Sequence, residues 1–147
     1  MDKNPANESG ADERPLCVGI ALVGRRGAYL IRQRPPGTAM AGFWEFPGGK
    51  CEPGESPEAA TARECREEIG LDVIVGRLRD EFTYRYPHAF VHLFYYDCAT
   101  VVPDAVPDPS TGFRWVAAEA LAELTFPEAN EPILVELARE AHDNRPA

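Results

Sequence analysis

Seven residues between Gly49 and Gly70 have types and spacings suited to binding a divalent cation. They follow the pattern G-x5-E-x7-R-E-x-x-E-E-x-G and are Gly49, Glu55, Arg63, Glu64, Glu67, Glu68 and Gly70. Carboxylates three and four positions apart on a helix lie on or near one face, where like charges repel one another. A cation among them would remove that repulsion, and an all-oxygen ligand set suits magnesium or manganese better than zinc. The pattern therefore predicts a helix that carries a Mg2+ site, with Mn2+ as a substitute.

The same segment carries signals for the ends of that helix. Ser56 and Pro57 are an N-cap residue and a first-turn proline, and Gly70 can end the helix in a left-handed turn. Arg63 can reach Glu67 one turn further on, so we expect the arginine to orient acidic side chains rather than to bind substrate. The apolar stripe expected to dock the helix consists of Ala59, Ala62, Cys65 and Ile69.

A glycine pair, Gly48 and Gly49, precedes the helix and is followed by Lys50. Two adjacent glycines let the backbone approach a metal or a phosphate without a side chain in the way. Such a pair usually marks only a turn, but its fixed distance from the acidic helix favours a functional loop. Lys50 is placed to touch a phosphate, although a lysine beside a loop is more often simply solvated.

This arrangement resembles the Nudix hydrolases. The resemblance rests on the spacing from Gly49 to Gly70, on WEFPGGK directly before the helix, and on FPEANEPI at residues 126–133. It implies the Nudix fold, an α/β (α+β) architecture in which a mixed β-sheet is sandwiched between helices. It also implies hydrolysis of a phosphoanhydride bond by metal-activated water.

The resemblance implies roles for the acidic residues. The metal ligands would be Gly49 through its carbonyl oxygen, Glu64, Glu67 and Glu68. The catalytic set would comprise Glu64 as ligand and base, Glu67, Arg63, and an acid from a later loop. Alignment through Trp115 places that acid at Pro109. We therefore assign it to the adjacent Asp108, with Asp104 as the alternative.

Within the family, the chain is similar to the MutT-like branch, which cleaves nucleoside triphosphates, 8-oxo-dGTP among them, to a monophosphate and pyrophosphate. That likeness implies that Asn130 reads the purine edge, since an amide offers both a donor and an acceptor. It also implies that Phe46 packs on the base, that Arg34 lies near the base or sugar, and that Tyr86 flanks the pocket. Each has an alternative: Asn130 could cap the last helix, Phe46 could be core, and Arg34 could be a surface residue.

Length, charge and hydrophobicity limit the domain organisation, the partners and the location that the chain can have. The chain has 147 residues and a formal net charge of -9, which fits one globular domain and argues against a nucleic-acid duplex as partner. No apolar run reaches membrane-spanning length, so we expect no membrane partner and a cytoplasmic location. Residues 1–14 are predicted to be a disordered polar leader and residues 15–147 a single Nudix domain. The oligomeric state, monomer or dimer, stays open.

The four cysteines show no C-x-x-C pair and no zinc-type spacing. They are Cys17, Cys51, Cys65 and Cys98. Because disulfides are rare in cytosolic proteins, we expect all four to be reduced, with Cys51 the most accessible.

Alternating and apolar runs predict the remaining elements. Strands are expected at residues 16–23, 28–34, 71–86, 89–100 and 113–116. A short helix is expected at residues 117–124, and an amphipathic helix from Glu128 or Asn130 onward. The proline-rich residues 101–112 are expected to form an irregular loop.

Two alternative functions remain open at this stage. One is a Nudix hydrolase for another nucleotide, such as dCTP or CTP, ADP-ribose or a dinucleoside polyphosphate. The other is a non-catalytic nucleotide-binding module, which the intact set of acids disfavours. A substrate panel with product identification separates them.

Overall fold

The computed structural model describes residues 14–144. The predicted leader, residues 1–14, therefore lies outside the described residues except for Arg14. Within the described part, no helix is long and apolar enough to cross a membrane.

One mixed sheet organises the described chain. Its main strand order is β4-β3-β2-β7-β6, with β5 paired to β2 and β8 paired to β3. β2 and β7 run parallel, whereas the other pairs are antiparallel. The strands are β2 (Leu16–Arg25), β3 (Ala28–Gln33), β4 (Trp44–Glu45), β5 (Gly48–Lys50), β6 (Val73–Tyr86), β7 (Ala89–Thr100) and β8 (Arg114–Ala117).

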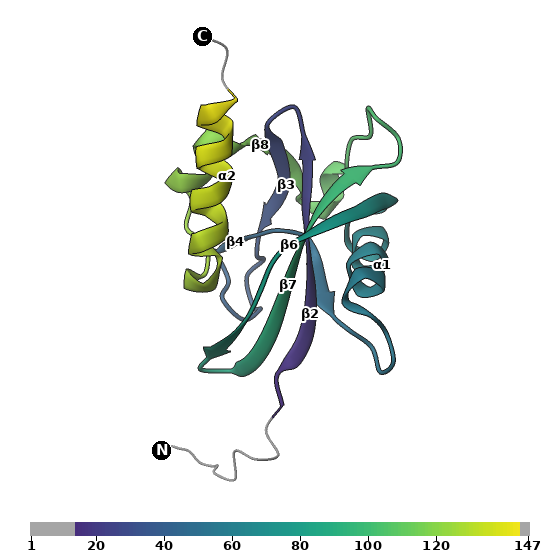
Figure 1. The fold of residues 1–147 in the computed structure, drawn as a ribbon, viewed down its shortest axis with the longest axis vertical. Helices are drawn as coiled ribbons and strands as arrows, with labels where there is room; N and C mark the ends of the chain where they lie inside the picture. Colours follow the sequence, from purple (N-terminus) through teal and green to yellow (C-terminus); the bar gives the residue numbers. More distant parts are fainter. Residues whose placement is uncertain (1–13, 145–147) are drawn as a thin grey trace.

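Helices cover the sheet from opposite sides. α1 (Pro57–Ile69) lies on one side and α2 (Glu131–Asp143) on the other (Figure 1). The short 3-10 turns are η2 (Pro109–Thr111), η3 (Ala118–Glu123) and η4 (Glu128–Asn130). The predicted sandwich of a mixed sheet between helices is therefore confirmed.

The central strands β2 and β7 are mostly apolar because both of their faces are covered. In β2, Leu22 belongs to a core cluster with Ile133 and Leu137 of α2, whereas its neighbours Ala21 and Val23 belong to a second cluster. That second cluster includes Cys65 and Ile69 of α1, and β7 divides its side chains in the same way. Successive strand residues point to opposite faces, so one strand builds both cores.

The predicted elements match the observed ones apart from their ends and from two short strands. The expected glycine loop is the strand β5, and β4 was not predicted. The first strand extends to Arg25, the third begins at Val73 rather than at residue 71, and the last begins at Arg114. The expected helix at residues 117–124 is a six-residue 3-10 segment, a form common in short connections. The terminal α-helix begins at Glu131, after the η4 turn.

The expected docking stripe of α1 is partly wrong. The buried residues of this helix are Ala60, Thr61, Cys65 and Ile69, whereas Ala59 is exposed. Thr61 lies over Gly19 of β2, where any side chain would collide with the threonine hydroxyl. That hydroxyl donates to the carbonyl oxygen of Pro57 at 2.7 Å. A count of apolar residues misses Thr61 because its polar atom is satisfied within the helix.

The expectation that all four cysteines are reduced is wrong for two of them. Cys17 and Cys51 form a disulfide, while Cys65 and Cys98 are free and buried. Val18 pairs with Lys50 in the antiparallel β2–β5 ladder, so the preceding and following cysteines face each other. Their Cα atoms are 5.3 Å apart, within bonding range. Their separation of 34 positions in sequence gave no sign of this contact.

We predict that a Cys17→Ser, Cys51→Ser double variant is less stable than the wild type. Loss of a cross-link between residues 34 positions apart lowers the free energy of unfolding by about 3 to 4 kcal/mol in the chain-entropy treatment. Urea unfolding with and without a thiol reductant measures this. The wild type should lose stability on reduction, and the double variant should not respond. A wild type indifferent to reductant would contradict the prediction.

Candidate functional site

The ends of α1 are set as the sequence predicts, and they fix the acidic side chains. The Ser56 hydroxyl accepts a hydrogen bond from the Ala59 N–H at 3.1 Å, and Pro57 occupies the first turn. Gly70 has φ 77° and its N–H donates to the carbonyl oxygen of Arg66 at 3.0 Å. A helix held at both ends presents its acids in a fixed order.

Arg63 is the centre of the acidic cluster. Its guanidinium donates to both oxygens of Glu55 at 2.8 and 2.9 Å. Further bonds run to Glu67 at 3.1 Å, to Glu64 at 3.3 Å and to the carbonyl oxygen of Lys50 at 3.0 Å. These five bonds use all five guanidinium donors. Arg63 thus makes the expected contact with Glu67 and has no donor left over for a ligand.

Hydrogen bonds from Arg63 lower the pKa of Glu55 to about 2. The Glu55 carboxylate is therefore charged throughout the neutral range. Its role is to hold the arginine at the start of the helix, where the guanidinium also reaches the loop carbonyl of Lys50.

Glu64 and Glu68 face the glycine strand β5. The Gly48 N–H donates to Glu68 at 3.0 Å, and a side chain at Gly49 would collide with the Glu64 carboxylate. Burial raises the pKa of Glu64, and burial raises the pKa of Glu68 to about 7 against the opposing effects of Gly48 and Arg32. Both carboxylates are removed from water, and the positive charge near them is too small to offset the effect of burial on their pKa values.

Glu67 is the most exposed of the three acids. Its side chain is 58% exposed and bonds to Arg63, while those of Glu64 and Glu68 are 17% and 21% exposed. In the described range 14–144, no three acidic, histidine or cysteine side chains converge as a metal site would require. Glu64 and Glu67 nevertheless lie beside the same Arg63 nitrogen, at 3.3 and 3.1 Å. That the three carboxylates lie on or near one face as joint metal ligands stays a prediction.

The residues present nevertheless fit a hard divalent cation. The candidate donors are all oxygens, from carboxylates and from the Gly49 carbonyl group, and magnesium and manganese prefer such ligands. The absence of a side chain at Gly49 leaves the Glu64 carboxylate accessible from the loop. A cation would also relieve the burial cost that raises the pKa values of Glu64 and Glu68.

Glu45 is a site residue that sequence reasoning missed. Its two oxygens accept from Arg32 at 2.8 Å and from Arg34 at 2.7 Å, and its side chain is 18% exposed. Arg32 also lies 3.7 Å from Glu68. An acid inside the otherwise apolar WEF segment was the available signal. The pairing of Arg32 with Glu45 across β3 and β4 explains why it is there.

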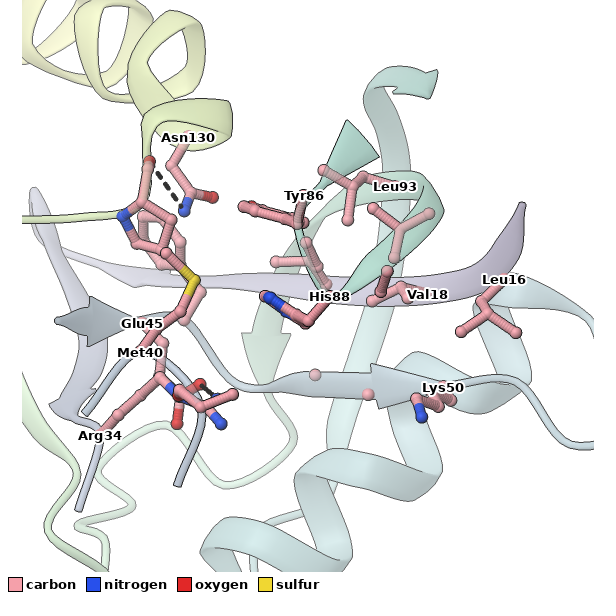
Figure 2. Close-up of a pocket in the computed structure, with 18 of the residues that line it drawn as sticks. Leu16, Val18, Arg34, Met40, Glu45, Lys50, Tyr86, His88, Leu93 and Asn130 are labelled. Atoms are coloured by element: carbon pink, nitrogen blue, oxygen red, sulfur yellow. Dashed lines mark hydrogen bonds and ion pairs between the residues drawn. The ribbon is translucent and has the colours of Figure 1, made fainter. Parts of the chain in front are cut away.

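A pocket of about 380 Å3 lies on the α2 side of the sheet. In Figure 2, Asn130 lies at one end and Lys50 toward the other, with Tyr86 and His88 between them. Its floor is aliphatic and comes from β2 and β7. The pocket gathers all five predicted substrate-binding residues, Arg34, Phe46, Lys50, Tyr86 and Asn130, together with Gly48 and Gly49.

Asn130 occupies the N-cap position of α2, but its side chain does not cap the helix. The side chain is buried instead, with its amide oxygen accepting a 2.8 Å bond from the Tyr95 hydroxyl. Its amide nitrogen lies 3.5 Å from the carbonyl oxygen of Pro127. The helix-cap alternative therefore lacks its hydrogen bond.

The other pocket residues combine structural and ligand-facing positions. Phe46 is buried and lies 5.3 Å from the Phe126 ring, so it is a core residue with one face on the pocket. Tyr86 stacks on His88 at 5.2 Å. Arg34 is held by Glu45 and by a 2.6 Å bond to the Ala39 carbonyl oxygen, which limits its freedom at the pocket rim.

The two loop acids lie apart from this cluster. Asp108 is exposed and its carboxylate accepts from the Ser110 N–H at 2.9 Å, a bond that lowers its pKa. Asp104 lies 3.9 Å from Arg26 in the β2–β3 turn. Asp108 is linked to Arg32 through Thr111: the Thr111 hydroxyl donates to the Asp108 carbonyl oxygen at 2.8 Å, and the Thr111 carbonyl oxygen accepts a 3.5 Å bond from Arg32.

Comparison with known proteins adds independent findings. A family model for the NUDIX domain matches residues 18–136. A relative from Haemophilus influenzae named 8-oxo-dGTP diphosphatase is 35% identical over 90% of this chain and 98% of its own. An Escherichia coli relative named CTP pyrophosphohydrolase is 49% identical, but over only 40% of this chain and 44% of its own. The solution structure of the E. coli ORF135 protein has TM-score 0.71 and 30% identity, covering 93% of this chain and 97% of that one.

We predict that Gly49→Ala weakens divalent-cation binding while leaving the fold intact. The new methyl group would meet only the end of the Glu64 side chain, which can move aside at the expense of its position. Affinity for Mn2+, measured by titration calorimetry, should fall about 10- to 100-fold, as when a ligand loses its support. Gly24→Ala, in strand β2 against the Tyr29 ring, is the matched control and should bind Mn2+ normally. Equal Mn2+ affinity in both variants would exclude a cation site beside Gly49 and Glu64.

Proposed function

The chain belongs to the Nudix hydrolase family, and from that premise we propose that it is a metal-dependent pyrophosphohydrolase that cleaves nucleoside triphosphates to a monophosphate and pyrophosphate. Its preferred substrate is 8-oxo-dGTP, so its role is sanitation of the nucleotide pool. The family match over residues 18–136 and the full-length likeness to an 8-oxo-dGTP diphosphatase support this substrate.

The observation that carries the proposal is the position of β5. Gly48 and Gly49 line the pocket that contains Asn130, and they also touch the carboxylates of Glu68 and Glu64. A nucleotide with its base at Asn130 therefore has its phosphates directed toward the glycine strand and the acids behind it. Lys50 follows the glycines and lines the same pocket, so it supplies positive charge on that path.

Each residue then has a separate task. Glu64, Glu67 and Glu68 hold a divalent cation, Mg2+ or Mn2+, with the Gly49 carbonyl oxygen as a further ligand. When bound, such a cation neutralises charge on the phosphoryl oxygens and lowers the pKa of water. Glu64, whose pKa is raised by burial, accepts the proton of the attacking water. Arg63 positions Glu64 and Glu67.

Asp108 remains our choice for the additional loop acid, with Asp104 as the alternative. Asp108 is favoured because its 3-10 turn is linked through Thr111 to Arg32, which lies 3.7 Å from Glu68. The oligomeric state, a cytoplasmic location and the absence of a nucleic-acid duplex partner also remain predictions.

A second candidate substrate is a pyrimidine triphosphate. The 49% identity to a CTP pyrophosphohydrolase over 59 residues favours this alternative, but that match covers less than half of either chain. Turnover of 8-oxo-dGTP, dGTP and CTP at matched Mg2+, with the products identified by chromatography, decides between them. Preference for CTP would overturn the purine assignment while leaving the chemistry in place.

We predict that Glu67→Gln lowers kcat by several orders of magnitude without unfolding the protein. Glutamine keeps the shape of the side chain but removes the ligand charge, and the exposed position of Glu67 tolerates the change. Stopped-time assays at saturating Mg2+ and a melting curve measure the two effects. Glu123→Gln, on the exposed surface of η3, is the control and should retain full turnover. Unchanged kcat in Glu67→Gln would remove this residue from the metal site.

We also predict that Asn130→Ala lowers kcat/KM for guanine nucleotides more than for pyrimidine ones. Deleting the amide leaves base atoms unpaired at a cost of about 1 to 3 kcal/mol, or roughly five- to 150-fold. Comparison of 8-oxo-dGTP, dGTP and dCTP measures this selectivity. An equal loss for all three, with a lower melting temperature, would show that Asn130 acts only on stability.

A further inference from the structure

The side chain of Asn130 is held by a residue that the family resemblance did not single out. Tyr95 lies in the middle of β7, is fully buried, and packs its ring 5.7 Å from Phe82. Its hydroxyl donates to the amide oxygen of Asn130 at 2.8 Å. Both residues line the pocket, so this bond lies in its wall.

A second contact fixes which way the Asn130 amide faces. The carbonyl oxygen of Pro127 lies 3.5 Å from the amide nitrogen of Asn130. If the amide were turned over, its oxygen would face that carbonyl oxygen, and two acceptors would repel each other. Because Pro127 requires the nitrogen on its side, the amide oxygen must face Tyr95.

Tyr95 acts as the donor in this pair. Burial raises the pKa of its hydroxyl, so the hydroxyl keeps its proton at neutral pH. The amide oxygen of Asn130 therefore already accepts one hydrogen bond. Of the two amide hydrogens, one has no acceptor among the described residues. Toward a ligand, Asn130 thus offers chiefly an N–H donor.

Resting on the proposed function, we propose that Tyr95 is a positioning residue that fixes the amide of Asn130 and thereby makes the pocket prefer bases that present a carbonyl oxygen over bases that present an amino group.

The selectivity follows from donor and acceptor matching. Guanine presents an oxygen acceptor at the position where adenine presents an amino donor. An amino group opposite the Asn130 N–H sets two donors against each other in a buried site, and neither can then reach water. The unpaired groups correspond to a roughly five- to 150-fold loss in kcat/KM.

The test compares dITP with dATP, which differ at position 6 of the purine in carrying a carbonyl or an amino group. The wild type should hydrolyse dITP with a kcat/KM roughly five- to 150-fold higher than that for dATP. Tyr95→Phe keeps the ring against Phe82 but frees the amide to turn, so the dITP to dATP ratio should fall at least about fivefold. Most of that change should appear in KM rather than in kcat, since the base lies away from the acids.

Tyr84→Phe is the matched control. The Tyr84 hydroxyl donates to Glu128 at 2.7 Å, so this variant also removes a tyrosine bond to the η4 turn, but it leaves the amide of Asn130 untouched. Its dITP to dATP ratio should equal that of the wild type. Melting temperatures of all three proteins separate selectivity from stability.

Three results would overturn the inference. An unchanged ratio in Tyr95→Phe, with or without a lower melting temperature, would make Tyr95 purely structural. A wild type that hydrolyses both nucleotides equally well would remove the carbonyl preference while leaving the proposed function intact. A wild type that hydrolyses no nucleoside triphosphate would overturn the inference and the proposed function together.

Discussion

The close approach of α1 to strands β2 and β5 is the contact on which the site depends. Gly19 permits it, because a side chain there would collide with the Thr61 hydroxyl and with the backbone carbonyl oxygen of Pro57. At Gly49 a side chain would displace only the carboxylate of Glu64. A helix separated from the sheet by ordinary side chains would lie several ångströms further away. Its carboxylates would then be out of reach of the Gly48 N–H. The glycine strand and the acidic helix therefore act as one unit.

That proximity concentrates negative charge in a chain that is already acidic, with a net charge of -9. Arg63 offsets the charge on the solvent side of the helix, and Arg32 does so on the sheet side through Glu45 and Glu68. The compensation is incomplete, since burial still raises the pKa of Glu64. Incomplete compensation of this negative charge suits a cation site. Carboxylates fully neutralised by arginines would gain little free energy from binding a cation.

How far the sequence could be interpreted depends on how local each signal is. The helix ends at Ser56 and Gly70 were predictable because caps act within a few residues. The mixed sheet followed from the family resemblance. Contacts made by strand pairing were not predictable: Glu45 meets Arg32 across two strands, and Cys51 meets a cysteine 34 positions earlier. Asn130 was found from its motif, but the bond that holds its amide depends on β7, which no local pattern links to the last helix.

The parallel pairing of β2 with β7 has a consequence for how the protein folds. Leu16 pairs with Val91, and the register continues to Val23 opposite Cys98. The floor of the pocket is therefore made of two segments far apart in the chain, with β3, β4, β5, α1 and β6 between them in sequence. Pairings of such long sequence separation close slowly because their loop entropy is lost before the contacts form. During synthesis, β2 can pair with β3 and β5 first, but this edge of β2 stays unpaired until β7 has emerged from the ribosome.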